Sequence, residues 1–220
     1  MIKHILLTII FVFILLIVLP VSLTFGIKYL PGDVQPSLTN TEKIYGEFSL
    51  SQTFISPKDN LAGIGVSIKN PNFANKKEAT VKLYDENNNL TRTVVLNGKN
   101  IADGKFVKIF FDPISNCLNK KFTWVISSPD SKFEDALEIF LTDKKPSWSG
   151  ELKVGEKISN SSLSYITLHK VKTPTEVLNI VISGWINNLL SDKVFAGVYG
   201  LILLLLIGGI FISSKSRFQN

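Results

Sequence analysis

The sequence predicts a mainly β protein: an antiparallel, jelly-roll-like β-sandwich flanked by two transmembrane α-helices and a juxtamembrane amphipathic helix. Three observations predict it: long uncharged runs near both chain ends, a central series of runs in which apolar and polar residues alternate, and turn-forming residues between those runs. Of the 220 residues 45% are hydrophobic, which excludes a wholly disordered chain. A single cysteine excludes an intramolecular disulfide framework and any cysteine-rich zinc site.

Residues 1–29 are predicted to be an N-terminal transmembrane anchor. No charged residue interrupts the stretch from Ile5 to Ile27, and about 20 apolar residues span a hydrocarbon core of roughly 30 Å. A signal peptide cleaved near Gly26 is the alternative. The apolar stretch is long for the core of a signal peptide, usually about 7–15 residues, which favours the anchor. Both alternatives export the residues that follow.

Residues 193–213 are predicted to be a second transmembrane helix, and residues 214–220 a cytoplasmic tail. The stretch from Val194 to Ser213 is uncharged and apolar around its whole circumference, unlike a helix that buries one face. Lys and Arg favour the cytoplasmic side of a membrane. We therefore expect a two-pass protein with both termini in the cytoplasm, as indicated by three cations beside the apolar runs: Lys3, Lys215 and Arg217.

Between these runs, residues 30–46 are predicted to be a linker and residues 47–172 the extracytoplasmic sandwich. Prolines and a glycine break up the first stretch, and no period is visible in it. The second stretch contains about eight runs with the period of two that is typical of strands with one face on a core. These runs cover 48–54, 64–68, 81–84, 91–96, 107–111, 122–127, 137–142 and 163–168.

An amphipathic juxtamembrane helix is predicted over residues 173–192. Thr173 suits the N-cap, and Glu176 completes a capping box. Apolar residues then leave only a narrow polar stripe, which favours a helix in the membrane interface with Trp185 at headgroup level. A helix packed on the sandwich and a helix hairpin with the first membrane segment are the alternatives.

The stretch from Phe48 to Asp130 resembles bacterial membrane-anchored jelly-roll β-sandwiches similar to carbohydrate-binding modules, which occur beside membrane glycosyltransferases. The resemblance is carried by Ser51-Gln52-Thr53-Phe54, Asp59-Asn60-Leu61-Ala62-Gly63-Ile64, Phe111-Asp112-Pro113-Ile114 and Phe122-Thr123-Trp124-Val125-Ile126-Ser127-Ser128-Pro129. It implies a sandwich fold. Because the chain does not show the multi-span catalytic portion of those enzymes, any role that the resemblance implies is an accessory one.

Four residues are candidates for contact with a sugar. Gln52, Asn60 and Asp112 fall at expected strand ends or loops, where they offer hydrogen-bonding groups, and Trp148 lies in a loop as a stacking surface. Sugar hydroxyls need hydrogen bonds, and the C–H face of a sugar stacks on an aromatic ring. Trp124, in contrast, alternates with apolar neighbours and is predicted to belong to the core.

The sequence indicates no catalytic, metal or cofactor site. It contains no nucleophile elbow, phosphate-binding loop, dinucleotide fingerprint or zinc-protease motif. Asp59, Asn60, Asp103 and Asp112 offer oxygen atoms to a structural calcium, but they lack the spacing of a calcium loop and are predicted to be turn formers. His169 is expected at the surface, and Cys117 is expected to pack or to remain free without a catalytic base.

The formal charge of +6 first suggests nucleic acid as a partner, but its distribution contradicts that interpretation. Four cations lie beside the apolar runs, at Lys3, Lys28, Lys215 and Arg217. All 18 acidic residues lie between those runs, so the exported stretch is close to neutral.

We therefore expect a non-enzymatic binding or interaction module of the cell envelope. Its expected partners are the lipid bilayer and an envelope glycan or another membrane protein. The alternative is an accessory subunit of a membrane enzyme complex that acts through its transmembrane helices. Ala196 and Gly200, a pair of small residues four positions apart, would let two such helices approach closely.

Overall fold

The computed structural model describes residues 26–32, 37–102 and 104–215, and the chain falls into two compact units. The first unit comprises Met1–Lys28 and Val171–Asn220, and the second comprises Tyr29–Lys170. Most of the predicted N-terminal anchor, with Lys3, lies outside the described residues, as do Asp103 and the end of the chain from Ser216, which includes Arg217.

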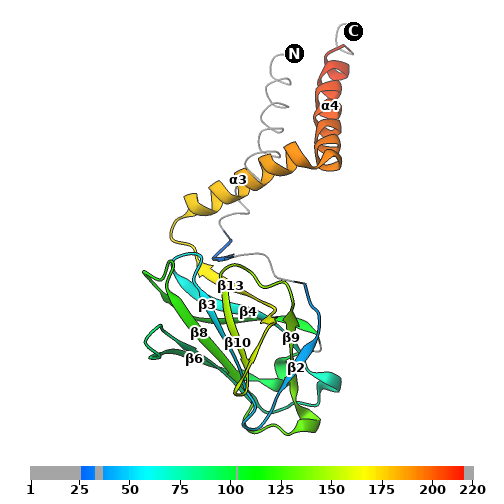
Figure 1. Cartoon of the computed structure of the whole chain (residues 1–220). Helices are drawn as coiled ribbons and strands as arrows, with labels where there is room; N and C mark the ends of the chain where they lie inside the picture. The colour runs from blue at the N-terminus through cyan, green and yellow to red at the C-terminus, as the bar shows by residue number, and fades with distance from the viewer. Residues whose placement is uncertain (1–25, 33–36, 103, 216–220) are drawn as a thin grey trace. The chain divides into compact units, whose positions relative to one another are not determined.

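Two antiparallel sheets form the second unit (Figure 1). One has the strand order β1-β13-β4-β9-β12, with β2 on β9 and β7 on β4, and the other has the order β11-β10-β3-β8-β5-β6. The predicted mainly β, antiparallel sandwich is thus confirmed. The strands are β1 (Tyr29–Pro31), β2 (Thr41–Ile44), β3 (Leu50–Ile55), β4 (Leu61–Lys69), β5 (Glu78–Tyr84), β6 (Leu90–Asn97), β7 (Lys105–Ile114), β8 (Lys121–Ser127), β9 (Leu137–Thr142), β10 (Ser149–Val154), β11 (Lys157–Ser159), β12 (Ser162–Leu163) and β13 (Tyr165–Lys170).

The core lies between the sheets and follows the predicted alternation. Strands β3, β5 and β8 bury every second residue, and Trp124 on β8 is fully buried, as predicted. Burying each large apolar side chain contributes roughly 1.5–3 kcal/mol. Strand β4 does not alternate and is buried on both faces, because its outer positions are small and neighbouring side chains cover them.

Part of the predicted linker forms strands. Strand β1 pairs with β13, with Tyr29 opposite Lys170, and β2 pairs with β9, where it places Ile44 in the core. Residues 30–46 therefore contribute to both ends of one sheet. These strands have three and four residues, too few for a period of two to be recognised.

Two helices follow the sandwich along the chain, α3 (Pro174–Ser191) and α4 (Lys193–Lys215). The predicted capping box is not formed at α3. The Thr173 hydroxyl pairs with that of Thr175 at 2.8 Å, and the Glu176 carboxylate accepts from the amide of Lys172 at 3.2 Å. The carboxylate thus reaches one residue further back than the motif requires.

The predicted membrane contacts of these helices stay predictions. Within residues 26–32, 37–102 and 104–215, no helix is both long and apolar enough to cross a bilayer. Trp185 on α3 is 39% exposed and packs edge-on against Tyr199 of α4, with ring centroids 5.2 Å apart.

Candidate ligand-binding site

Gln52, a predicted sugar contact, is fully buried in the sandwich. Its Nε2 donates to Ser149 Oγ at 3.1 Å, and its Oε1 accepts from Ser162 Oγ at 3.1 Å and from the Leu163 amide at 3.0 Å. Ser149 belongs to the sheet of Gln52, whereas Ser162 and Leu163 belong to the other sheet. Gln52 therefore joins the two sheets, in place of the ligand contact that the sequence predicts.

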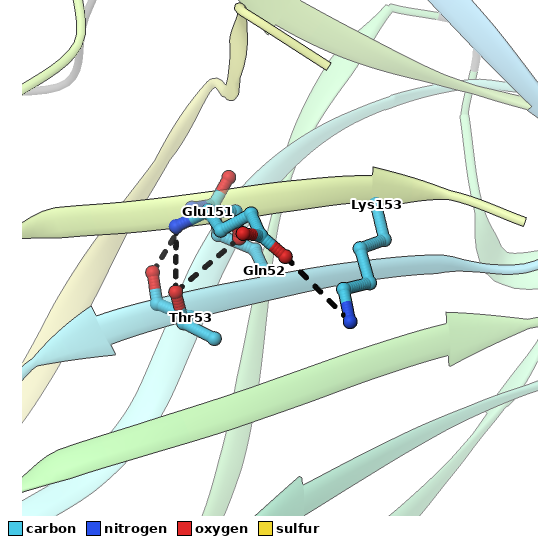
Figure 2. A network of polar contacts seen from close by, with 4 residues as sticks. All are labelled: Gln52, Thr53, Glu151 and Lys153. Carbon is cyan, nitrogen blue, oxygen red and sulfur yellow. Dashed lines mark hydrogen bonds and ion pairs between the residues drawn. The ribbon is translucent and has the colours of Figure 1, made fainter. Parts of the chain in front are cut away.

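Beside Gln52, the side chain of Thr53 holds a β-bulge in β10 (Figure 2). Thr53 Oγ1 accepts from the Glu151 amide at 2.6 Å, and a Cβ on Gly150 would lie only 2.1 Å from that oxygen. The Glu151 carboxylate lies 3.6 Å from Lys153 Nζ in an exposed ion pair, which contributes little to stability. The polar groups of this network thus serve the fold.

Trp148, the predicted stacking surface, is only 9% exposed. Its ring packs edge-on against Tyr165, with centroids 5.1 Å apart, and Tyr165 also contacts Trp124. Burial raises the pKa of the Tyr165 hydroxyl. Trp148 therefore closes the core at this point and presents no open ring face of the kind that a sugar stacks on.

Asn60 and Asp112 lie at one end of the sandwich, outside the hydrogen bonds of Gln52. The pairing of Leu61 with Ile114 brings the start of β4 and the end of β7 together. Asn60 has a φ of 55°, and its carbonyl accepts from the Lys170 amide at 2.9 Å. Asp112 is exposed on β7. The structure thus separates buried Gln52 and Trp148 from half-buried Asn60 and exposed Asp112.

At the opposite end, where β3 begins and β10 ends, lies a groove of about 370 Å³. This volume is near the lower limit of small-molecule sites, roughly 300–1,000 Å³. We call it the Phe48 groove, and its lining residues are Glu42, Phe48, Val154, Glu156, Lys157, Ile158 and Ser159. Sequence reasoning missed it because these residues come from β2, the turn before β3 and the β10–β11 hairpin.

Neighbouring residues hold the Phe48 ring in place while 39% of the residue stays exposed. The ring stacks on Tyr45, with centroids 5.7 Å apart and planes 10° apart, and Tyr45 meets Phe133 edge-on. A Cβ on Gly155 would lie 3.6 Å from Phe48 Cε2, and Gly155 has a φ of +59°, which favours glycine in this turn. Phe48 thus offers a supported, partly open aromatic surface.

Charged groups border that ring. Within the part of the chain that the structure describes, Glu42, Glu156 and Lys157 take part in no ion pair. Carboxylates accept hydrogen bonds from hydroxyl groups, and an ammonium group donates to them. An open ring can pack against the apolar face of a ligand while the ligand's polar groups reach the charged groups beside it.

A second hollow of about 260 Å³ lies between the loops that follow β5 and β7. Its Asp85 carboxylate accepts from the amides of Asn89 at 2.8 Å and Asn87 at 2.9 Å. These hydrogen bonds, above all that from Asn89, lower the pKa of Asp85. Because Asp85 is engaged by its own turn, this hollow is the weaker candidate.

The remaining candidates for chemistry are buried. His169, expected at the surface, is 3% exposed; its Nδ1 lies 3.0 Å from the Asp59 carbonyl and its Nε2 2.9 Å from Thr167 Oγ1. Cys117 packs in the core, as predicted, and its sulfur accepts from the Leu61 amide at 3.3 Å. Among the described residues, no three His, Cys, Asp or Glu side chains gather into a metal site.

No family model and no curated protein matches this sequence. Among solved structures, the chain is similar to a family two carbohydrate esterase from Cellvibrio japonicus, with a TM-score of 0.28 and 8% identity over 65% of this chain and 35% of that chain. It is also similar to a family two carbohydrate esterase from Clostridium thermocellum in complex with cellohexaose, with a TM-score of 0.27 and 14% identity over 61% and 32%. The chain thus spans about a third of those proteins. TM-scores this low carry no argument about its fold or activity.

Proposed function

We propose that this chain is a non-enzymatic, membrane-anchored β-sandwich module of the cell envelope that binds glycans in the Phe48 groove. The observation that carries the proposal is the exposed Phe48 ring beside the carboxylates of Glu42 and Glu156. Exposed aromatic rings in a concave site are the usual anchors of ligand binding.

The charges of the groove indicate which glycans fit. Two carboxylates and one ammonium group, those of Glu42, Glu156 and Lys157, line it. Neutral sugars and amino sugars can donate hydrogen bonds to the carboxylates, whereas an acidic sugar would be repelled by them. We therefore expect neutral or amino sugars to bind best.

The experiment is a glycan array probed with the full chain purified in detergent, followed by calorimetry on the best ligand. We expect Phe48→Ala to weaken binding about tenfold or more, because the stacking surface is lost. Phe73→Ala is the matched control, since Phe73 is 56% exposed and does not line the groove. Equal affinity of the Phe48→Ala variant and the wild type would refute the groove as the site.

Membrane anchoring rests on the sequence. The uncharged stretches from Ile5 to Ile27 and from Val194 to Ser213 are each about 20 residues long, and cations follow both. We expect the chain to stay in the membrane fraction after alkaline extraction, with the sandwich accessible to protease only from outside the cell. Recovery in the extract would contradict the anchor.

An accessory subunit of a membrane complex is the second candidate function. A Cβ added at Gly197 or Gly200 of α4 would meet no described atom within 4 Å, and small residues of this kind allow the close approach of another helix. If partners bind there, replacing Ala196 and Gly200 together by Leu should abolish their co-purification. Unchanged co-purification would remove the basis of this candidate.

A further inference from the structure

Two aromatic rings reach toward each other across the outer face of the sheet that contains β1, β13, β4 and β7. Tyr29 on β1 and Phe110 on β7 have ring centroids 4.5 Å apart, although β13 and β4 lie between their strands. Strand pairing places Leu168 and Gly63 next to each other between them. The rings therefore form a bridge over two strands.

Glycines in strand β4 leave room for aromatic rings above its backbone. Gly63 lies opposite Phe110, and a Cβ on Gly63 would be 3.3 Å from Phe110 Cδ1. A Cβ on Gly65 would be 2.3 Å from Phe106 Cζ, so the second ring excludes any side chain there. The rings of β7 thus lie close over the backbone of β4.

These rings are open to their surroundings despite that packing. Phe110 is 42% exposed and Tyr29 is 36% exposed, whereas Leu168 beneath them is 4% exposed. Alternate residues of a strand share a face, so Lys108 and Asp112 of β7 and Lys170 of β13 lie on this side of the sheet. All three residues are exposed. The face thus combines aromatic rings with a small excess of positive charge. We name Tyr29, Phe106, Lys108, Phe110 and Lys170 the bridge face.

The course of the chain indicates what meets this face. Tyr29 stands two residues after Ile27, the last residue of the first uncharged stretch, so their Cα atoms are at most about 7 Å apart. Tyr29 pairs directly with Lys170, which lies four residues before the start of α3 at Pro174. If the apolar stretches enter a bilayer, the bridge face therefore begins within a few residues of the bilayer surface.

We propose that the bridge face rests on anionic lipid headgroups. Tyr and other aromatic residues favour the membrane interface, where the ring is partly buried, and Lys side chains are attracted by anionic lipids. This inference rests on the proposed membrane anchoring. It gives the sandwich a fixed side toward the lipid and leaves the Phe48 groove, which lies at the start of β3, directed to other ligands.

The test uses the full chain in vesicles, with tryptophan quenching by lipids brominated in the acyl chain. Trp185→Phe removes the tryptophan of α3, and Trp124 and Trp148 are at most 9% exposed. In that background Phe110→Trp reports on the bridge face. The matched control is Tyr84→Trp, on the outer face of the other sheet, where Tyr84 lies opposite Thr123.

In vesicles of phosphatidylcholine with phosphatidylglycerol, we expect the Phe110→Trp variant to be quenched about twofold or more relative to the Tyr84→Trp variant. Adding Lys108→Gln and Lys170→Gln should reduce this difference by about half, because the attraction of the lysines is lost.

Three results would overturn the inference, and they are distinguishable. A chain that does not sediment with vesicles contradicts the anchoring itself and the inference with it. A chain that sediments but shows equal quenching in both variants contradicts only the contact of the bridge face. Equal quenching of the Phe110→Trp variant in neutral and anionic vesicles contradicts the choice of anionic headgroups.

Discussion

The bridge face and the Phe48 groove use the same side chain in different ways. Phe110 on the bridge face is 42% exposed and Phe48 in the groove is 39% exposed. Phe110 lies close to the backbone of Gly63, with Lys108 on the same strand face, whereas Phe48 borders a hollow with Glu42 and Glu156. Exposure alone therefore does not identify a function. The shape and the charge around a ring decide whether it suits a surface or a small ligand.

The largest expected effect concerns Gln52, the residue that joins the two sheets. Gln52→Leu would leave the buried amide of Leu163 without its acceptor. It would also remove the Gln52 amide from the hydroxyls of Ser149 and Ser162, which still bond to each other at 2.7 Å. We expect the free energy of unfolding to fall by about 3 kcal/mol or more. Denaturant unfolding of the full chain in detergent measures it, with Ser51→Ala on the outer face as control. A loss below about 1 kcal/mol would show that the sheets do not depend on this link.

Gly65→Ala should distinguish the bridge face from the Phe48 groove, because it damages only the bridge face. The new Cβ would lie 2.3 Å from Phe106 Cζ, and such overpacking costs about 1–3 kcal/mol. Adding Phe106→Ala should restore part of the lost stability, because the clash disappears. Glycan affinity, which depends on the Phe48 groove, should not change in either variant. Loss of glycan affinity in the folded Gly65→Ala variant would mean that the bridge face and the Phe48 groove are coupled.

Neutralising the groove should have a smaller effect, confined to ligand binding. Glu42→Gln with Glu156→Gln keeps the shape and removes the charge from the acceptors, so we expect glycan affinity to fall about tenfold. Lys108→Gln on the bridge face serves as the comparison and should leave that affinity unchanged. Equal losses from both substitutions, measured by calorimetry, would contradict the assignment of the groove.

The smallest effect is a pH dependence at Asp85. Its folded pKa is lower than the ordinary value of 3.8 because the amides of Asn89 and Asn87 hydrogen-bond to the carboxylate. The resulting stability is present above that ordinary value and is lost as the pH falls through the lower folded pKa. Asp85→Asn should therefore slightly lower the melting temperature near neutral pH and have no effect near about pH 2. A difference that persists in acid would contradict this origin.

The strands with clear alternation could be predicted from the sequence, and the same alternation held information about the site. Gln52 has the parity of Leu50 and Phe54, which face the core, and His169 has the parity of Tyr165, which is fully buried. Their polar character indicated a surface, but the period of two placed them inside, where hydrogen bonds compensate their burial.

Other features depend on contacts that no local pattern contains. The three-residue strand β1 exists because β13 supplies its partner, and the Phe48 groove needs three distant segments to meet. The bulge at Gly150 depends on a hydroxyl from Thr53, almost a hundred residues away. Pairing of this kind across long sequence separations is set by the whole fold.

The pairing of β1 with β13 also determines how the sandwich would carry a mechanical load. Tyr29 lies opposite Lys170. The amide of Val171 donates to the carbonyl of Lys28 at 3.0 Å, an ordinary length for such a hydrogen bond. Tension that draws the two flanking segments apart would act on the open end of this strand pair, so its hydrogen bonds would break one after another. The short strand β1 would detach first. Gln52 and the strands around Gln52 would carry force only after β1 had detached.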